Sequence, residues 1–130
     1  MIYLVDSDRV ADFLRGRPDA VLLFHQLLTD GMAMSIVTFA KVYEDIYFGR
    51  DRAHHEAVFR TLLRGIPVLG INRSIARQFA AIQGTLRAQG QLIAASDTFI
   101  AATALYHKLT LVTRNIRHFQ RIPGLSLHTP

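Results

Sequence analysis

The chain contains no cysteine among its 130 residues. This absence excludes a disulfide framework, a thiolate metal site and a cysteine nucleophile, and it fits a reducing, cytoplasmic environment. No apolar run approaches the roughly 20 residues that span a bilayer, so we expect no membrane partner. The N-terminus also lacks the basic start and long apolar stretch of a secretory signal peptide.

Other common kinds of functional site are missing as well. There is no glycine-rich phosphate loop, which argues against nucleotide binding of the P-loop type. No two of the six histidines are spaced four apart on one expected helix, so a zinc site is not expected. A phospho-receiver domain needs an aspartate at the end of its third strand, where this chain has Gly70-Ile71-Asn72.

Basic residues outnumber acidic ones by 15 to 10, and nearly all of the excess is arginine. Arginine forms forked contacts with phosphate, which predicts a nucleic-acid partner. A solvated basic surface or an acidic protein partner would explain the net charge of +5 equally well.

Short apolar runs alternate with amphipathic segments along the chain. We expect strands at residues 2–5, 34–37, 66–71 and 109–113, with a short fifth at 125–128. The segments between them predict helices, the first capped by Ser7 or Asp8. Helices that separate successive strands imply a mostly parallel sheet of four to five strands, covered on both faces. The sequence therefore predicts an α/β/α sandwich, with residues 1–130 forming a single domain.

Four polar residues stand at or just beyond the expected strand ends or at helix starts: Asp6, Lys41, Asp97 and Asn115. Ligands of parallel sheets bind beyond the carboxyl ends of the strands, so we expect these side chains to converge. Clustered carboxylates could hold Mg²⁺ or Mn²⁺, which could activate water at a phosphodiester. Turn formation and helix capping explain the same residues, and their spacing alone favours that simpler explanation.

Motifs along nearly the whole chain resemble, in the right order, those of PIN-domain ribonucleases, the VapC toxins of bacterial and archaeal toxin–antitoxin pairs. Each motif is weak alone, and the combination is specific. The segments are 3–8 (YLVDSD), 35–41 (SIVTFAK), 97–104 (DTFIAATA), 111–119 (LVTRNIRHF) and 121–125 (RIPGL).

The resemblance implies a PIN-like fold and a metal-dependent endoribonuclease that hydrolyses phosphodiester bonds in tRNA or other structured RNA. It implies a cognate antitoxin and a homodimer. It makes Asp6 and Asp97 catalytic, metal-binding carboxylates for Mg²⁺ or Mn²⁺, with Asn115 as an auxiliary ligand.

The chain departs from the family pattern at Lys41, where the family carries glutamate. Thr38 as N-cap with glutamate three residues later would form a capping box, whereas lysine cannot accept that bond and opposes the helix dipole. We expect the ammonium to pair with Asp6 and Asp97, replacing one metal charge and weakening the ion site. Glu44, one turn further along the helix, is an alternative metal donor.

Three interpretations of Lys41 stay open: an inactivating change in a toxic ribonuclease, a natural degenerate member that no longer cuts, or a site rescued by Glu44. The alternative to an enzyme is a catalytically inactive PIN module that only binds its antitoxin or RNA. Arg114 and Arg117 beside Asn115, with Arg9 and Arg15 near Asp6, are the candidate RNA contacts.

Overall fold

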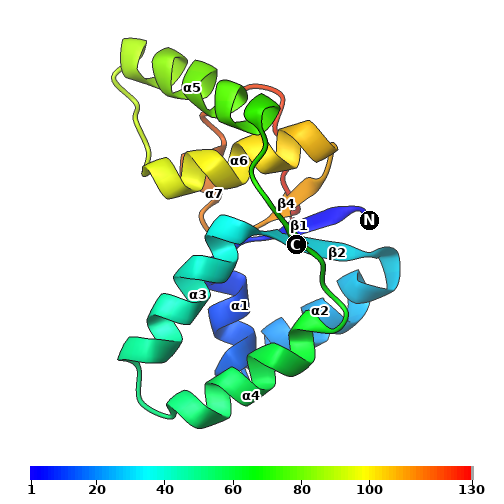
Figure 1. Ribbon diagram of the computed structural model, residues 1–130. Helices are drawn as coiled ribbons and strands as arrows, with labels where there is room; N and C mark the ends of the chain where they lie inside the picture. The colour runs from blue at the N-terminus through cyan, green and yellow to red at the C-terminus, as the bar shows by residue number, and fades with distance from the viewer. Residues whose placement is uncertain (130) are drawn as a thin grey trace.

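A parallel sheet of four short strands runs through the middle of the molecule (Figure 1). The computed structural model describes residues 1–129. The strands lie in the order β3-β2-β1-β4, with bounds β1 (Tyr3–Val5), β2 (Met32–Ser35), β3 (Val68–Leu69) and β4 (Thr110–Val112). The helices are α1 (Ser7–Leu14), α2 (Pro18–Asp30), α3 (Ile36–Phe48), α4 (Arg52–Leu63), α5 (Arg73–Ala88), α6 (Ala95–His107) and α7 (Ile116–Phe119).

Neighbouring residues on each strand supply two cores, one on each face of the sheet. On β1, Val5 packs with α1–α4, whereas Leu4 packs with α5 and α6. On β4, Val112 and Leu111 divide in the same way, because successive strand side chains point to opposite faces. Figure 1 shows the resulting layers, with α1–α4 below the sheet and α5 and α6 above it. The predicted α/β/α sandwich with a parallel sheet is confirmed.

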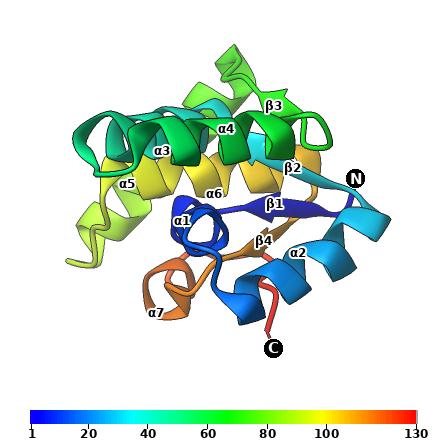
Figure 2. The same cartoon turned by 90° about the horizontal axis from the view of Figure 1, so that it is seen from below.

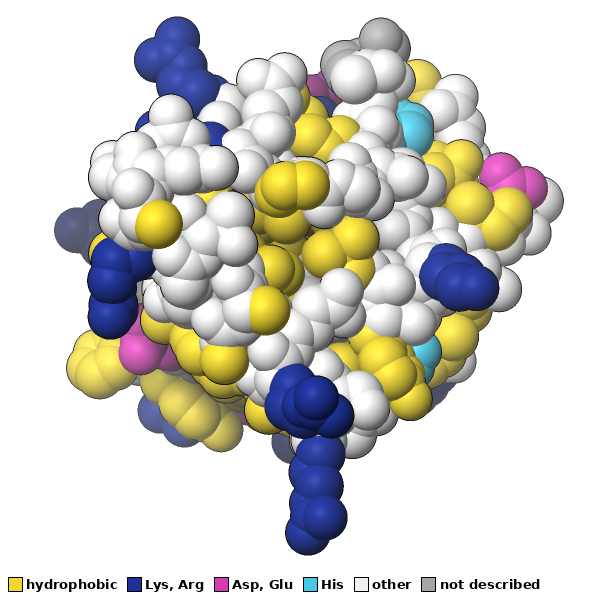
Figure 3. Space-filling model, turned by 90° about the horizontal axis from the view of Figure 1, so that it is seen from above, with side chains coloured by type: hydrophobic (Ala, Val, Ile, Leu, Met, Phe, Trp, Pro, Cys, Tyr) yellow, Lys and Arg dark blue, Asp and Glu magenta, His cyan; other side chains and the backbone are white. Residues whose placement is uncertain are grey.

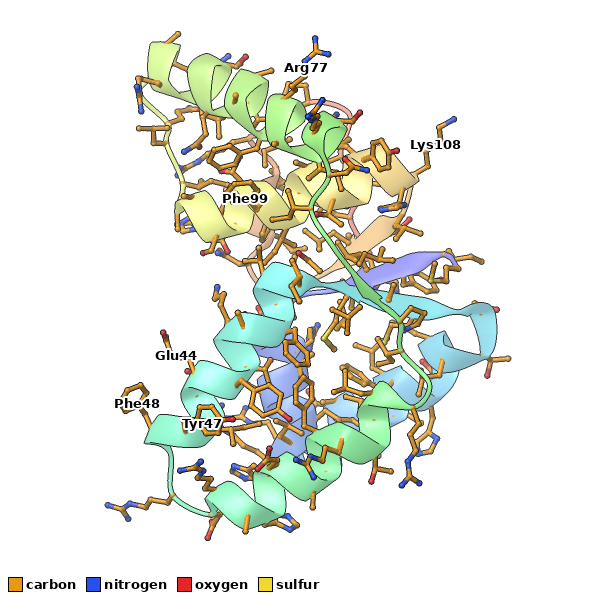
Figure 4. The ribbon with its side chains drawn as sticks, in the orientation of Figure 1. Glu44, Tyr47, Phe48, Arg77, Phe99 and Lys108 are labelled. Carbon is orange, nitrogen blue, oxygen red and sulfur yellow. The ribbon has the colours of Figure 1, made fainter. Side chains whose placement is uncertain are left out.

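The layer above the sheet is held by one dense helix pair. The rings of Phe79 and Phe99 stack with centroids 3.8 Å apart, joining α5 to α6 (Figure 4). On its outer face a cavity of about 220 Å³ lies between α5, Leu105 and Pro123, and apolar side chains show at the surface there (Figure 3). This layer carries Asp97 in the first turn of α6.

Several predicted boundaries are wrong for identifiable reasons. The second strand ends at Ser35, whose hydroxyl accepts a hydrogen bond from the Val37 amide at 3.0 Å and so caps α3. Thr38 is therefore not the cap, and Lys41 lies in the second turn of α3. Lys41 therefore lies beyond the first turn, where the capping box forms and the helix dipole acts most strongly.

Two sheet segments are shorter than predicted. β3 is reduced to Val68–Leu69, an edge strand whose first residue is exposed and whose partner in the sheet is β2. The expected fifth strand is an isolated parallel bridge between Leu111 and Leu127. The sheet thus has four strands, at the lower end of the predicted range. Within residues 1–129, the helices are all too short or too polar to cross a bilayer.

Candidate active site

Asp6 directly follows β1 and is the N-cap of α1. Figure 2 shows β1 leading into α1, with α7 close to that helix. Asp6 is 4% exposed. One carboxylate oxygen accepts from the Ser7 amide at 2.7 Å, so Asp6, rather than Ser7 or Asp8, is the N-cap of α1. The other oxygen accepts from the Thr113 hydroxyl at 2.8 Å. Asp6 is therefore fixed from both β1 and β4.

Thr113 joins Asp6 to Asn115. Its hydroxyl donates to Asp6 and accepts from the Asn115 amide at 3.0 Å. The side-chain nitrogen of Asn115 lies 2.8 Å from Nδ1 of His118, which accepts when that ring nitrogen is unprotonated. His118 is thus a neighbour of the site through Asn115.

Lys41 and Asp97 form the opposite side of the site. The lysine Nζ lies 3.6 Å from Asp97 Oδ1, and the two side chains are 38% and 13% exposed. The predicted pairing of Lys41 with Asp97 is confirmed, whereas the pairing predicted with Asp6 is not formed among the residues that the structure describes. Glu44 is exposed on the same helix one turn later (Figure 4), and within residues 1–129 the ion pair of Lys41 is with Asp97.

Burial and neighbouring acidic side chains change the pKa of Asp6. Burial, followed by the charge of Asp8, raises the pKa of Asp6 to about 6, and Asp97 adds a smaller upward effect. The hydrogen bonds from Thr113 and Ser7 act in the opposite direction. Asp6 and Asp97 therefore interact electrostatically, which links the two sides of the site.

Two acidic residues on α1 that shape this site were not predicted from the sequence. Asp8 accepts from the Arg114 amide at 2.9 Å through Oδ2, and its buried Oδ1 has no hydrogen-bond partner in the described part of the chain. Asp12 is 2% exposed, and its Oδ2 lies 3.0 Å from Nε of Arg114. The signal for Asp12 was a charged residue between the apolar Val10 and Phe13, on the inner face of a helix.

The four predicted RNA-contact arginines lie at three places, and Arg15 is the exposed residue that follows α1. Arg114 and Arg117 are exposed on either side of Asn115. Arg9 instead lines a cavity with Asp19 on α2 and with residues near the C-terminus. Only Arg114 and Arg117 flank the site directly.

The oxygen atoms of Asp6, Asp97 and Asn115 are the hard donors that Mg²⁺ and Mn²⁺ prefer. The charge at position 41 opposes such an ion, because the ammonium already neutralises Asp97. Among residues 1–129, no group of three or more His, Cys, Asp or Glu side chains is arranged to hold a metal ion. The donor chemistry fits a divalent cation, and the set of acidic ligands is incomplete.

The chain resembles known proteins along nearly its whole length. Residues 3–125 match the family model of the PIN domain. Ribonuclease VapC1 of Haemophilus influenzae is 29% identical over 127 residues, covering 96% of this chain and 95% of that protein.

Solved structures match equally broadly. A chain from Rickettsia felis VapBC2, in a crystal structure with a promoter DNA fragment, has a TM-score of 0.90 at 22% identity, covering 98% of both chains. One from VapBC-1 of nontypeable Haemophilus influenzae has a TM-score of 0.85 at 25% identity, covering 98% of this chain and 97% of that one. The chain therefore belongs to the PIN-domain family, in the group of VapC-type ribonucleases.

Proposed function

We propose that this chain is the toxin of a type II toxin–antitoxin pair, with a site built for metal-dependent endonucleolytic cleavage of RNA and weakened by Lys41. The observation that carries the proposal is the ion pair between Lys41 Nζ and Asp97 Oδ1, 3.6 Å apart, beside the buried Asp6. A cation of the protein itself stands where the family resemblance implies an acidic ligand.

Asp6, Asp97 and Asn115 would hold Mg²⁺ or Mn²⁺, with Glu44 as a further donor. When bound, the ion would activate water and stabilise charge on the phosphodiester. Lys41 opposes metal binding in two ways. Its ammonium neutralises the charge of Asp97, and it repels the metal ion. A repulsion between unit charges about 4 Å apart is roughly 4 kcal/mol at an effective dielectric of 20, reduced here because the lysine is 38% exposed.

The proposed partners follow from the relatives. The similar structure from Haemophilus influenzae is a VapBC-1 complex, which supports a cognate antitoxin for this chain. The relatives named ribonucleases support an RNA substrate, such as tRNA or another structured RNA. A homodimer and a cytoplasmic location complete the proposal, on the basis of the family resemblance alone.

Lys41→Glu tests the proposal. We expect at least a tenfold gain in cleavage of a panel of tRNAs and other RNAs with Mg²⁺ or Mn²⁺, lost on adding a chelator. Lys108→Glu is the matched control, because it makes the same charge change at the far end of α6 (Figure 4). It should produce no gain. Equal cleavage by the Lys41→Glu variant and the parent chain contradicts the proposed role of Lys41.

Two other outcomes separate the remaining interpretations. The chain with Lys41 could already cut RNA with metal because Glu44 completes the site. In that case Glu44→Gln should abolish the cleavage. If neither form cuts any RNA, the second candidate function is favoured, a PIN module that binds its antitoxin or RNA without cleavage. That candidate draws on the same ion pair, which holds Asp97 without a metal ion, and predicts a tight complex that a chelator does not disturb.

A further inference from the structure

A buried carboxylate on α1 gathers arginines from two separate parts of the chain. Asp12 is 2% exposed. Its Oδ2 lies 3.0 Å from Nε of Arg114, and its Oδ1 lies 3.6 Å from Nε of Arg17 and 4.0 Å from Nη1 of Arg15. We call Asp12, Arg15, Arg17 and Arg114 the arginine node.

The node presents positive charge to solvent. Its carboxylate is buried, whereas the side chains of Arg15, Arg17 and Arg114 are 58%, 56% and 49% exposed. Three guanidinium groups around one carboxylate leave two positive charges in excess. Each guanidinium carries five N–H donors, and the contact of Asp12 with Arg114 is at Nε. The remaining donors of the node are sufficient to bind an anion.

The node adjoins the candidate active site through Arg114. The amide of that residue donates to Asp8 at 2.9 Å, and the preceding Thr113 donates to Asp6. The next residue is Asn115. The acidic side chains at this edge repel a polyanion, so a substrate with a phosphate backbone needs positive charge beside them.

We propose that the arginine node is a preorganised binding site for a backbone phosphate of RNA, with Asp12 as its positioning residue. This inference rests on the proposed function, because it names a contact for the RNA substrate. Asp12 fixes the guanidinium of Arg114 before RNA arrives, so less side-chain freedom is lost on binding. Planar guanidinium groups suit the tetrahedral oxygens of phosphate because they donate two bonds at once.

The sign of one charge change tests the inference. Asp12→Asn makes the chain one unit more positive, so general attraction predicts tighter RNA binding. The node predicts the opposite, an affinity for fluorescein-labelled tRNA that is about three- to tenfold weaker. The measurement is fluorescence anisotropy over a salt series with chelator present, which prevents cleavage. Asp30→Asn, an exposed site at the end of α2, makes the same charge change and should leave binding unchanged or slightly tighter.

A second pair of variants covers the case in which Asp12→Asn does not fold. Arg15→Ala with Arg17→Ala removes two exposed side chains, and Arg77→Ala with Arg87→Ala is the matched control on α5. We expect Arg15→Ala with Arg17→Ala to weaken tRNA binding strongly, and the control pair to have little effect. The slope of log affinity against log salt should fall by about 0.7 for each phosphate that the variant no longer binds.

Several results overturn the inference. They include a folded Asp12→Asn variant that binds tRNA as tightly as the parent, and equal effects of the two arginine pairs. If the node variants weaken the binding of polyglutamate but leave tRNA binding unchanged, the partner of the node is an acidic protein and not RNA. A parent chain that binds no RNA at all contradicts the proposed function itself, so the two failures are distinguishable.

Discussion

The two sides of the candidate active site are held by different kinds of contact. On the β1–β4 side, the Thr113 hydroxyl donates a buried hydrogen bond to Asp6 and accepts a partly buried one from the backbone amide of Asn115, and Asp8 Oδ2 lies 3.4 Å from the same hydroxyl. On the α3–α6 side, one ion pair with a partly exposed lysine joins Lys41 to Asp97. The first side depends on the sheet, whereas the second depends on two side chains that water reaches. A substitution at position 41 can therefore change the chemistry of the site while leaving the fold intact.

The largest expected effect is on the β1–β4 side, at Asp6. Its pKa rises from 3.8 in the reference state to about 6 in the folded chain. The folded state thus holds the proton more strongly, so the free energy of unfolding falls as the pH rises from about 4 to about 6. The full penalty is about 3 kcal/mol above that range. Asp6→Asn should remove this dependence and raise stability near pH 7.5, less the cost of the altered hydrogen bonds.

Urea denaturation at a series of pH values measures the effect of Asp6→Asn. Asp30→Asn is the control, because Asp30 is exposed at the end of α2 and its substitution should keep the slope of the parent chain. A parallel slope for Asp6→Asn and the parent between pH 4 and 6 would show that another group carries the dependence.

Thr113→Val is the next largest test of the same side. The change keeps the shape of the side chain and removes the hydroxyl that serves both Asp6 and Asn115. We expect a loss of about 1–3 kcal/mol in the free energy of unfolding, because buried groups lose their partner. Loss of this hydrogen bond also raises the pKa of Asp6 further, since the bond lowers it.

Thr103→Val is the matched control for Thr113→Val. The Thr103 hydroxyl donates to the carbonyl of Phe99 within α6, at 2.8 Å, where the helix already satisfies the backbone. Chemical denaturation should show a small change for Thr103→Val. Equal losses at the two threonines would mean that the hydroxyl of Thr113 has no special part in the site.

The sequence predicted the parallel sheet and the convergence at its edge because both follow from simple periodicities. Apolar runs separated by helices determine a parallel arrangement, and the strand ends then meet at one edge. The position of Lys41 in its helix was not predictable in the same way. Ser35 and Thr38 are both good caps, and only the end of strand pairing at Ser35 chooses between them.

The arginine node was not predicted because Arg114 is far along the chain from Asp12, Arg15 and Arg17. Asp12 and Arg114 meet only after α1 and the end of β4 have packed together. A buried acid on an amphipathic helix indicates that a cationic partner exists, but it does not identify the partner. Arg114 was predicted to contact RNA from its position beside Asn115 alone, and that role stays a prediction.

The smallest expected effect is the coupling across the α3–α6 side. Lys41→Met, Asp97→Asn and their combination form a double-mutant cycle that isolates the ion pair. We expect a coupling free energy below about 1 kcal/mol that decreases with added salt, because solvent screens a pair with an accessible lysine. Urea denaturation at low and high salt measures it. A coupling that exceeds the loss from Thr113→Val would reverse the comparison and make Lys41 a structural support, in which case Lys41→Glu would lower stability as well as change activity.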